Sequence, residues 1–201
     1  MSEAGVQRTG RGQQTRRRLI AAAGELFYSE GIKASGIEAI AGRAGVTKMT
    51  LYAHFASKDE LVAAYLAERN RYWWSYVEDK LARHATPAEK LLAVFDAYRE
   101  WLVSGGLRGC GFVNFSAEFP EAEHPGRAVV REHKAGVRRL LGGLATELGS
   151  EEPDALAEHL FLLLEGGYVT GALEGDEELL GRARSLAEAV VAERTGQQLD
   201  R

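Results

Sequence analysis

The chain has 201 residues, 45% of them apolar, and a formal net charge of -4. This length allows one large domain or two small ones. A single cysteine, Cys110, excludes an intramolecular disulfide bond. The first residues lack the apolar stretch of a secretory signal. The longest apolar run, residues 159–173, contains Glu165 and is shorter than the ~20 residues of a membrane span. We therefore expect a soluble, cytoplasmic protein without membrane contact.

The charges are unevenly distributed along the chain. Residues 1–60 hold 9 Lys and Arg against 6 Asp and Glu, whereas the remainder is acidic. A basic start on an acidic protein suggests a local contact with a polyanion, although a basic tail is often only solvated. The residue types favour helices, and alternating β-branched runs are absent, so we predict an all-α fold.

The N-terminal 60 residues are predicted to form a small helical domain behind a tail. Residues 1–14 are polar and Gly-rich, which predicts a disordered N-terminal tail. Thr15 is the expected cap of a first helix, which ends at Gly31. Ser35 is the expected cap of a second, short helix. The predicted domain covers residues 15–60.

A glycine turn at Gly45 separates this short helix from a third one, capped by Thr47. A Ser57–Glu60 capping box then opens a fourth helix. Two short helices joined by a tight glycine turn are typical of a helix-turn-helix, whose second helix lies in the DNA major groove. The alternative is a surface hairpin with incidental polar residues.

The third helix has two different faces. Val46, Leu51 and Phe55 form an apolar inner face. Lys58, in the first turn of the fourth helix, lies beside free backbone N–H groups, where a phosphate can bind. The outer face carries Thr47, Lys48, Thr50, Tyr52 and His54.

Residues 61–201 are predicted to form a second, larger helical domain, giving about nine helices in all. A fifth helix follows Pro87, a short sixth helix covers "CGFVNFSAEF", and a seventh runs from about Gly126 to Leu148. Two further helices carry the apolar residues from Leu156 to Gly171 and from Leu179 to Val191.

Aromatic residues at helical spacing in this second domain have two interpretations. Residue by residue, core packing is the commoner role, but together they also suit a pocket for a small apolar effector. Asn114 and Glu118 would then orient the ligand, and Glu118 would favour a cationic one. The apolar walls of the expected pocket are Trp73, Tyr76, Tyr98, Trp101, Phe112 and Phe115.

The last two helices suggest close helix–helix packing. The eighth is apolar nearly all round, and its glycines cost ~1 kcal/mol each relative to Ala, which makes sense where another helix approaches. The partner is either a second copy of the chain or another helix of the same bundle. The residues expected in a dimer interface are Leu156, Leu160, Leu163, Gly167, Gly171, Leu186 and Val190.

Other kinds of site find little support in the sequence. The histidines show no helical ligand pair for a metal, so we expect no metal and no cofactor. No nucleophile, base and acid form a recognisable set, so we do not expect an enzyme. Cys110 lies near Arg108, which allows a reactive thiol, but a lone cysteine is more often a small buried residue.

Residues 15–61, "TRRRLIAAAGELFYSEGIKASGIEAIAGRAGVTKMTLYAHFASKDEL", resemble the DNA-binding domain of the TetR family of bacterial transcriptional regulators. Phe27, "IEAIAGRAGV" and "LYAHFASKDEL" stand at the spacing of that family. The later part resembles the family through its helix count and through "GCGFVNFSAEF".

The resemblance implies a homodimer that binds a near-palindromic operator in double-stranded DNA and is released by a small-molecule effector. It favours the dimer interpretation of the last two helices and the pocket interpretation of the aromatic cluster. The alternatives are an activator of the same family, or a helical small-molecule-binding protein or enzyme that has lost DNA binding. By match to the family motif, the phosphate or groove contacts are Ser35, Thr47, Tyr52, His54 and Lys58, and the base readers are Lys48, Met49 and Thr50.

Overall fold

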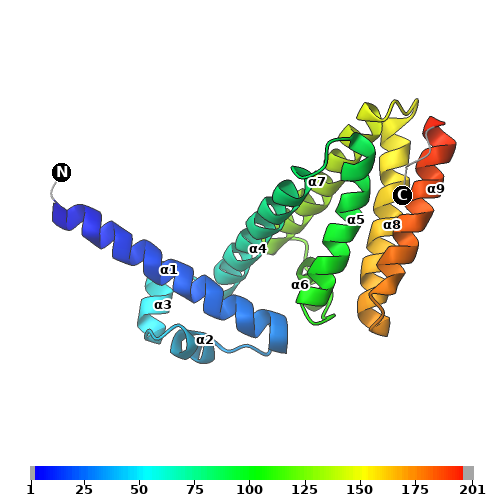
Figure 1. The fold of residues 1–201 in the computed structure, drawn as a ribbon. Coiled ribbons are helices and arrows are strands. Elements are labelled where there is room, and N and C mark those ends of the chain that lie inside the picture. Colours follow the sequence, from blue (N-terminus) through cyan, green and yellow to red (C-terminus); the bar gives the residue numbers. More distant parts are fainter. Residues whose placement is uncertain (1–2, 197–201) are drawn as a thin grey trace. The chain divides into compact units, whose positions relative to one another are not determined.

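The computed structural model describes residues 3–196, with side chains from Arg11 onward. These residues form nine α-helices and no strand (Figure 1), which confirms the all-α prediction. The helices are α1 (Glu3–Glu30), α2 (Ile37–Arg43), α3 (Lys48–His54), α4 (Lys58–Leu81), α5 (Pro87–Ser104), α6 (Gly111–Glu118), α7 (Gly126–Glu147), α8 (Pro153–Glu174) and α9 (Glu178–Thr195).

Two expectations about chain organisation need correction. Helix α1 begins at Glu3, so the stretch expected to be a disordered tail continues the first helix; this stretch contains no proline that would end a helix. Residues 1–2 of that predicted tail lie outside the described residues. The chain forms two compact units that are discontinuous in sequence. Unit 1 is Met1–Asn70 with Gly111–Val130, and unit 2 is Arg71–Cys110 with Arg131–Arg201.

The helices explain why a boundary at residue 60 is not observed. α4 is one continuous helix whose first half belongs to unit 1 and whose second half belongs to unit 2. The short helix α6 follows α5 in sequence but belongs to unit 1. Apolar spacing reports which face of a helix is buried, and it does not report which distant segment covers that face.

Unit 1 has a core built by α1 to α4. Leu19, Ile40, Leu51, Phe55 and Leu61 are fully buried there. Each comes from a different one of these helices or, for Phe55, from the residue that caps α3. Because α2 and α3 have only seven residues each, their orientation depends on these buried contacts more than on helix propensity.

Unit 2 contains α5, α8 and α9 packed against one another, with α8 and α9 side by side (Figure 1). Thr86 and Glu89 form a capping box at the start of α5, and Gly175 ends α8 in the left-handed conformation at φ 68°. No helix within the described residues is both long and apolar enough to cross a membrane.

Candidate DNA-binding surface and regulatory core

The helix-turn-helix predicted from the glycine spacing is present in the structure. α2 ends at Arg43, Gly45 has φ 65°, and α3 begins at Lys48. The Thr47 hydroxyl caps α3 by accepting a hydrogen bond from the Thr50 N–H at 3.1 Å. A positive φ favours glycine, and a threonine cap satisfies a free backbone donor, so both residues fix where the helix starts.

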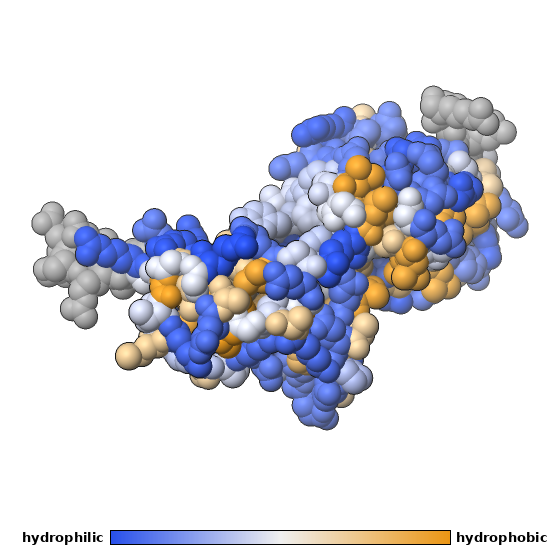
Figure 2. Space-filling model, turned by 90° about the horizontal axis from the view of Figure 1, so that it is seen from below, coloured by the Kyte–Doolittle hydropathy of each residue, from blue (hydrophilic) through white to orange (hydrophobic). Residues whose placement is uncertain are grey.

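The two faces of α3 differ as the sequence predicts. Leu51 and Phe55 are fully buried, whereas Met49 is 82% exposed and Tyr52 is 45% exposed. A single exposed apolar side chain is common on protein surfaces, so the exposure of Met49 shows only that this face of α3 is open to solvent. Figure 2, which looks at the molecule from below, shows mainly hydrophilic side chains with scattered hydrophobic ones over the α1–α3 region.

Lys48, one of the expected base readers, has a partner in the structure. Its ammonium lies 3.1 Å from the Glu38 carboxylate of α2, and both side chains are more than half exposed. Exposed ion pairs of this kind contribute about 0–1 kcal/mol. Lys48 can therefore exchange Glu38 for another anionic partner at little cost.

Ser35 does not have the role expected for it. Its side chain is only 1% exposed, and its hydroxyl donates to the Gly31 carbonyl at 2.7 Å. Its backbone N–H donates to the same carbonyl at 3.2 Å. It also does not cap α2, since Gly36 is the cap residue. Ser35 closes the α1–α2 connection and is not available to a phosphate, because the buried hydroxyl satisfies a local carbonyl.

Lys58 lies in the first turn of α4, as predicted. Ser57 accepts a hydrogen bond from the Glu60 N–H at 3.1 Å, as the predicted capping box requires. The Glu60 carboxylate accepts its bond from the Ala56 N–H at 2.8 Å, one residue before the expected donor. The Lys58 ammonium donates to the Lys33 carbonyl at 3.3 Å. Burial lowers the pKa of Lys58 from its usual value, and the carboxylates of Glu118 and Asp59 partly offset this effect.

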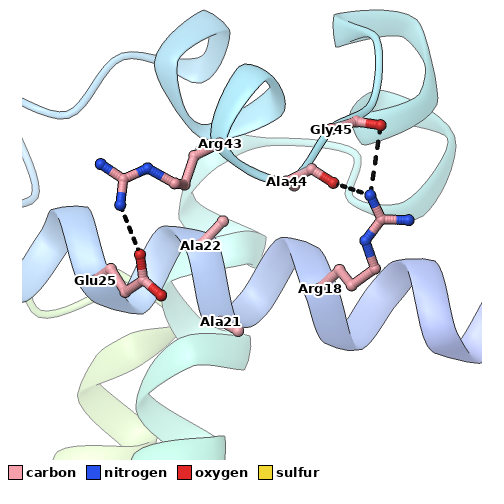
Figure 3. A pocket seen from close by; sticks show the side chains of 7 residues that line it. All are labelled: Arg18, Ala21, Ala22, Glu25, Arg43, Ala44 and Gly45. Carbon is pink, nitrogen blue, oxygen red and sulfur yellow. Dashed lines mark hydrogen bonds and ion pairs between the residues drawn. The ribbon is translucent and has the colours of Figure 1, made fainter.

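Two residues outside the predicted set hold the turn. Arg18 of α1 donates hydrogen bonds to the carbonyls of Ala44 and Gly45, and Arg43 pairs with Glu25 at 2.8 Å (Figure 3). These residues line a shallow pocket of about 240 Å³. The sequence "TRRRL" showed a basic cluster there, but nothing in it indicated that Arg18 satisfies the free carbonyls at the end of α2.

The expected effector residues are divided between the two units. In unit 2, Trp73 contacts Tyr98 and Trp101 with ring centroids 4.5 Å and 5.4 Å apart. Tyr76 contacts Trp101 at 5.4 Å and donates from its hydroxyl to Glu100 at 2.5 Å. Burial, followed by the Glu100 contact, raises the pKa of Tyr76 well above its usual range. These four aromatic residues form one cluster.

This cluster contains two buried donors without partners among the residues that the structure describes. Trp73 and Tyr98 are each 4% exposed, and within residues 3–196 neither the Trp73 Nε1 nor the Tyr98 hydroxyl has a hydrogen-bond partner. Burial raises the pKa of Tyr98 well above its usual range, and the nearby carboxylate of Glu165 adds to the shift. Buried polar groups are normally satisfied, so two neighbouring exceptions require an explanation.

In unit 1, the α6 residues of the predicted pocket have partners of their own. Phe112 and Phe115 are buried, and Phe115 stacks on Phe119 with ring centroids 5.4 Å apart. Asn114 is half-buried on the same helix. The two Glu118 oxygens accept hydrogen bonds from the backbone of Ile32 and Lys33. Glu118 is therefore used within unit 1, and the expectation that it orients a cationic ligand is not retained.

The dimer residues expected on α8 also need correction. Leu156, Leu160, Gly167 and Gly171 are buried within the chain. A Cβ at Gly167 would lie 3.0 Å from the Ala183 Cβ of α9. The close approach that explains this glycine is therefore an intrachain one, the alternative that the sequence left open.

The opposite face of α8 is exposed and apolar. Leu162 and Leu173 are exposed, Gly166 has open space around it, and Val169 is half-buried. These positions share one face because they are spaced by four, three and four residues. Of the other expected interface residues, Leu186 is exposed, whereas Leu163 and Val190 are half-buried. Figure 2 shows hydrophobic side chains gathered over the α5, α8 and α9 part of the molecule.

Comparison with known families decides the assignment. Residues 19–65 match the bacterial regulatory proteins of the tetR family, and residues 87–187 match the tetracyclin repressor-like C-terminal domain. The second match by itself spans half of the chain. This chain belongs to the TetR family.

Individual proteins that resemble this chain agree with this assignment. The structure of SCO4454, a TetR-family transcriptional regulator from Streptomyces coelicolor, has a TM-score of 0.84 and 31% identity, covering 91% of this chain and 97% of that one. The transcriptional activator FasR of Mycolicibacterium smegmatis is 36% identical over 44% of this chain. The transcriptional repressor KstR2 of Mycobacterium tuberculosis is 34% identical over 43% of it. The matches span 41% of FasR and 44% of KstR2, less than half of each relative.

Two members of the aromatic cluster of this TetR-family protein were not among the residues expected from the sequence. Tyr168 of α8 lies 5.3 Å from Tyr98, and His133 of α7 lies 6.2 Å from Trp73, both measured between ring centroids. Both residues are buried. Neither stands in an aromatic-rich segment, so only the helix packing reveals them. Among the residues that the structure describes, no group of His, Cys, Asp and Glu side chains is arranged to hold a metal.

Proposed function

We propose that this TetR-family protein is a ligand-responsive transcriptional repressor. It binds a near-palindromic operator as a homodimer and is released by a small, largely apolar effector. The observation that carries the proposal is the α3 helix, whose inner face is closed by Leu51 and Phe55 and whose outer face presents polar side chains to solvent. Nothing in the proposed function requires catalysis.

The residues of this surface divide by what they can contact. Lys48, Met49 and Thr50 stand at the start of α3, where side chains reach base edges in the major groove. Thr47, Tyr52, His54 and Lys58 supply hydroxyl, imidazole and ammonium groups for phosphates, which position the protein without reading sequence. Arg18 supports them by holding the turn.

The effector is proposed to bind at the aromatic cluster of unit 2. Its rings suit a flat, apolar molecule, and the free donors of Trp73 and Tyr98 suit hydrogen-bond acceptors on that molecule. Because the raised pKa of Tyr98 keeps its phenol protonated, the group stays a donor. A neutral aromatic compound with carbonyl or ether oxygens fits these donors.

The homodimer is proposed to form through the exposed face of α8 together with Leu186 and Val190 of α9. Leu162, Gly166, Val169 and Leu173 make a continuous apolar stripe on that face. Exposed apolar stripes of this kind mark interaction sites, and a two-fold axis would pair the stripe with itself. Two copies would then present two recognition helices.

The test is selection of bound sequences from random double-stranded DNA. We expect an enriched near-palindrome and a strongly salt-dependent affinity, since cationic side chains replace counterions on the phosphates. Lys48→Ala should change base preference by about 1–3 kcal/mol at the position it reads. Tyr52→Ala should weaken binding to all sequences alike. Recovery of no motif from the wild-type protein would contradict the specific-repressor proposal.

An activator is the second candidate, since FasR carries that name. The two functions differ in outcome at the same operator. In a transcription assay on the selected operator, a repressor lowers transcript levels and an activator raises them. Protein that binds an effector but no DNA would point instead to the alternative of a helical binding protein that has lost DNA binding.

A further inference from the structure

Glu118, the last residue of α6, joins two segments of unit 1 that are far apart in sequence. Its Oε1 accepts a hydrogen bond from the Ile32 N–H at 2.9 Å, and its Oε2 accepts one from the Lys33 N–H at 2.6 Å. A carboxylate can accept such a pair of bonds with both oxygens, and bonds to an ionised acceptor are stronger than neutral ones. The α1–α2 connection is therefore attached to α6.

This connection leads directly to the DNA-binding surface. The Lys33 carbonyl accepts a hydrogen bond from the Lys58 ammonium, and the Gly31 carbonyl accepts two from Ser35. Gly31 has φ 98°, a conformation that other residues rarely adopt. Residues 31–35 are thus held at both ends, and one of their carbonyls fixes the proposed phosphate contact Lys58.

The end of α6 is itself held in place. The Arg127 guanidinium donates to the Phe119 carbonyl at 2.6 Å and to the Ser116 carbonyl at 3.4 Å. The Lys33 ammonium lies 5.2 Å from the centre of the Phe119 ring, a favourable cation–π distance. The backbone on both sides of Glu118 is therefore held in place, and with it the start of the Glu118 side chain.

We propose that Glu118 is a positioning residue for DNA binding, because its carboxylate fixes the 31–35 connection and, through the Lys33 carbonyl, the ammonium of Lys58. The inference rests on the proposed DNA-binding function. A negative charge close to Lys58 opposes the approach of phosphates, so the contribution of Glu118 is geometric. Operator affinity then depends on the position of the C-terminal end of α6.

The test separates geometry from charge with three variants. Glu118→Asp keeps the charge but shortens the side chain, so it no longer spans both N–H groups. Glu118→Gln removes the charge and keeps one acceptor oxygen. Glu121→Gln makes the same charge change at an exposed residue just after α6 and serves as the control. Each variant is compared with wild type for binding to the selected operator and to unrelated duplex DNA, and for amide hydrogen exchange over residues 31–35.

We expect Glu118→Asp to weaken operator binding about tenfold, the scale of one lost charge-assisted hydrogen bond. Binding to unrelated DNA should weaken by a similar factor, because Lys58 is a proposed phosphate contact that does not read sequence. Amide exchange over 31–35 should become faster. Glu121→Gln should behave as wild type. Unchanged operator affinity in Glu118→Asp, or an equal loss in Glu121→Gln, would overturn the positioning role while leaving the repressor proposal intact.

The remaining outcomes are also decisive. A wild-type protein that binds no DNA overturns the proposed function, and the positioning role with it. If Glu118→Asp fails to fold, Glu118→Gln provides the milder test, since one hydrogen bond survives. In that variant, faster exchange over 31–35 with unchanged affinity for both the operator and unrelated DNA would show that Glu118 serves stability alone.

Discussion

At the scale of single residues, the two unpartnered donors of the aromatic cluster stand out. A buried hydroxyl without a partner lowers stability, so its removal should not destabilise the protein. The neighbouring rings of Trp73 and Trp101 would pack against a molecule bound at this hydroxyl. The hydroxyl of Tyr98 is therefore the part proposed to contact a ligand, while the ring of Tyr98 contributes to the core.

We predict that Tyr98→Phe leaves the free energy of unfolding of the ligand-free protein unchanged or slightly higher. Tyr98→Ala, in contrast, should lower it by about 3–5 kcal/mol because a cavity replaces a buried ring. Denaturant unfolding of both variants measures this difference. A loss above about 1 kcal/mol in Tyr98→Phe would show that the hydroxyl is already bonded, and the argument for an acceptor-bearing effector would fail.

At the scale of elements, the two sides of α8 have different surroundings. Its Gly167 and Gly171 side faces α9 and the turn that follows α8, and its Leu162 and Leu173 side faces solvent. A Cβ at Gly171 would lie 2.8 Å from the Asp176 backbone carbonyl oxygen. Backbone cannot move aside as a flexible side chain can, so a side chain at this position should destabilise the fold of the chain itself.

We predict that Gly171→Ala lowers the free energy of unfolding by about 1–3 kcal/mol through overpacking. Gly143→Ala is the matched control, because Gly143 lies inside α7 and a methyl group there would meet none of the described residues within 4 Å. That variant should gain up to about 1 kcal/mol in helix propensity. Thermal unfolding compares the two. Equal stability of both variants would argue that α8 and α9 are less closely packed than described.

At the scale of the whole molecule, operator affinity should depend on assembly. Two half-site contacts that are linked in one dimer act together, so their combined affinity exceeds that of either contact alone. A charged substitution in the exposed apolar stripe of α8 should separate the two copies of the proposed dimer. Leu173, which is 82% exposed, can be changed without disturbing the core of the chain.

We predict that Leu173→Glu yields a folded monomer by light scattering and loses most operator affinity, because a charge placed in an apolar interface is not compensated. Val103→Glu makes a similar change at an exposed position of α5 outside the stripe and should remain a dimer. A Leu173→Glu protein that stays dimeric would place the interface elsewhere.

The sequence alone determined the all-α class, the helix-turn-helix and the exposed outer face of α3. These features depend on local signals: the glycine turn at Gly45, the Thr47 cap, and the spacing of Leu51 and Phe55. Such signals come from residues that are close together in sequence. Helix periodicity and capping chemistry are therefore enough to predict these features.

Only the tertiary structure decided the roles of Ser35, Glu118 and the α8 glycines. Each depends on a partner that the residue's own local sequence pattern does not identify. Ser35 is buried against Gly31, Glu118 bonds Ile32 and Lys33 more than eighty residues away, and Gly167 faces Ala183 of α9. A polar or small residue has the same local pattern whether it meets a ligand, a second copy or its own chain, because side-chain contacts follow from packing and not from periodicity.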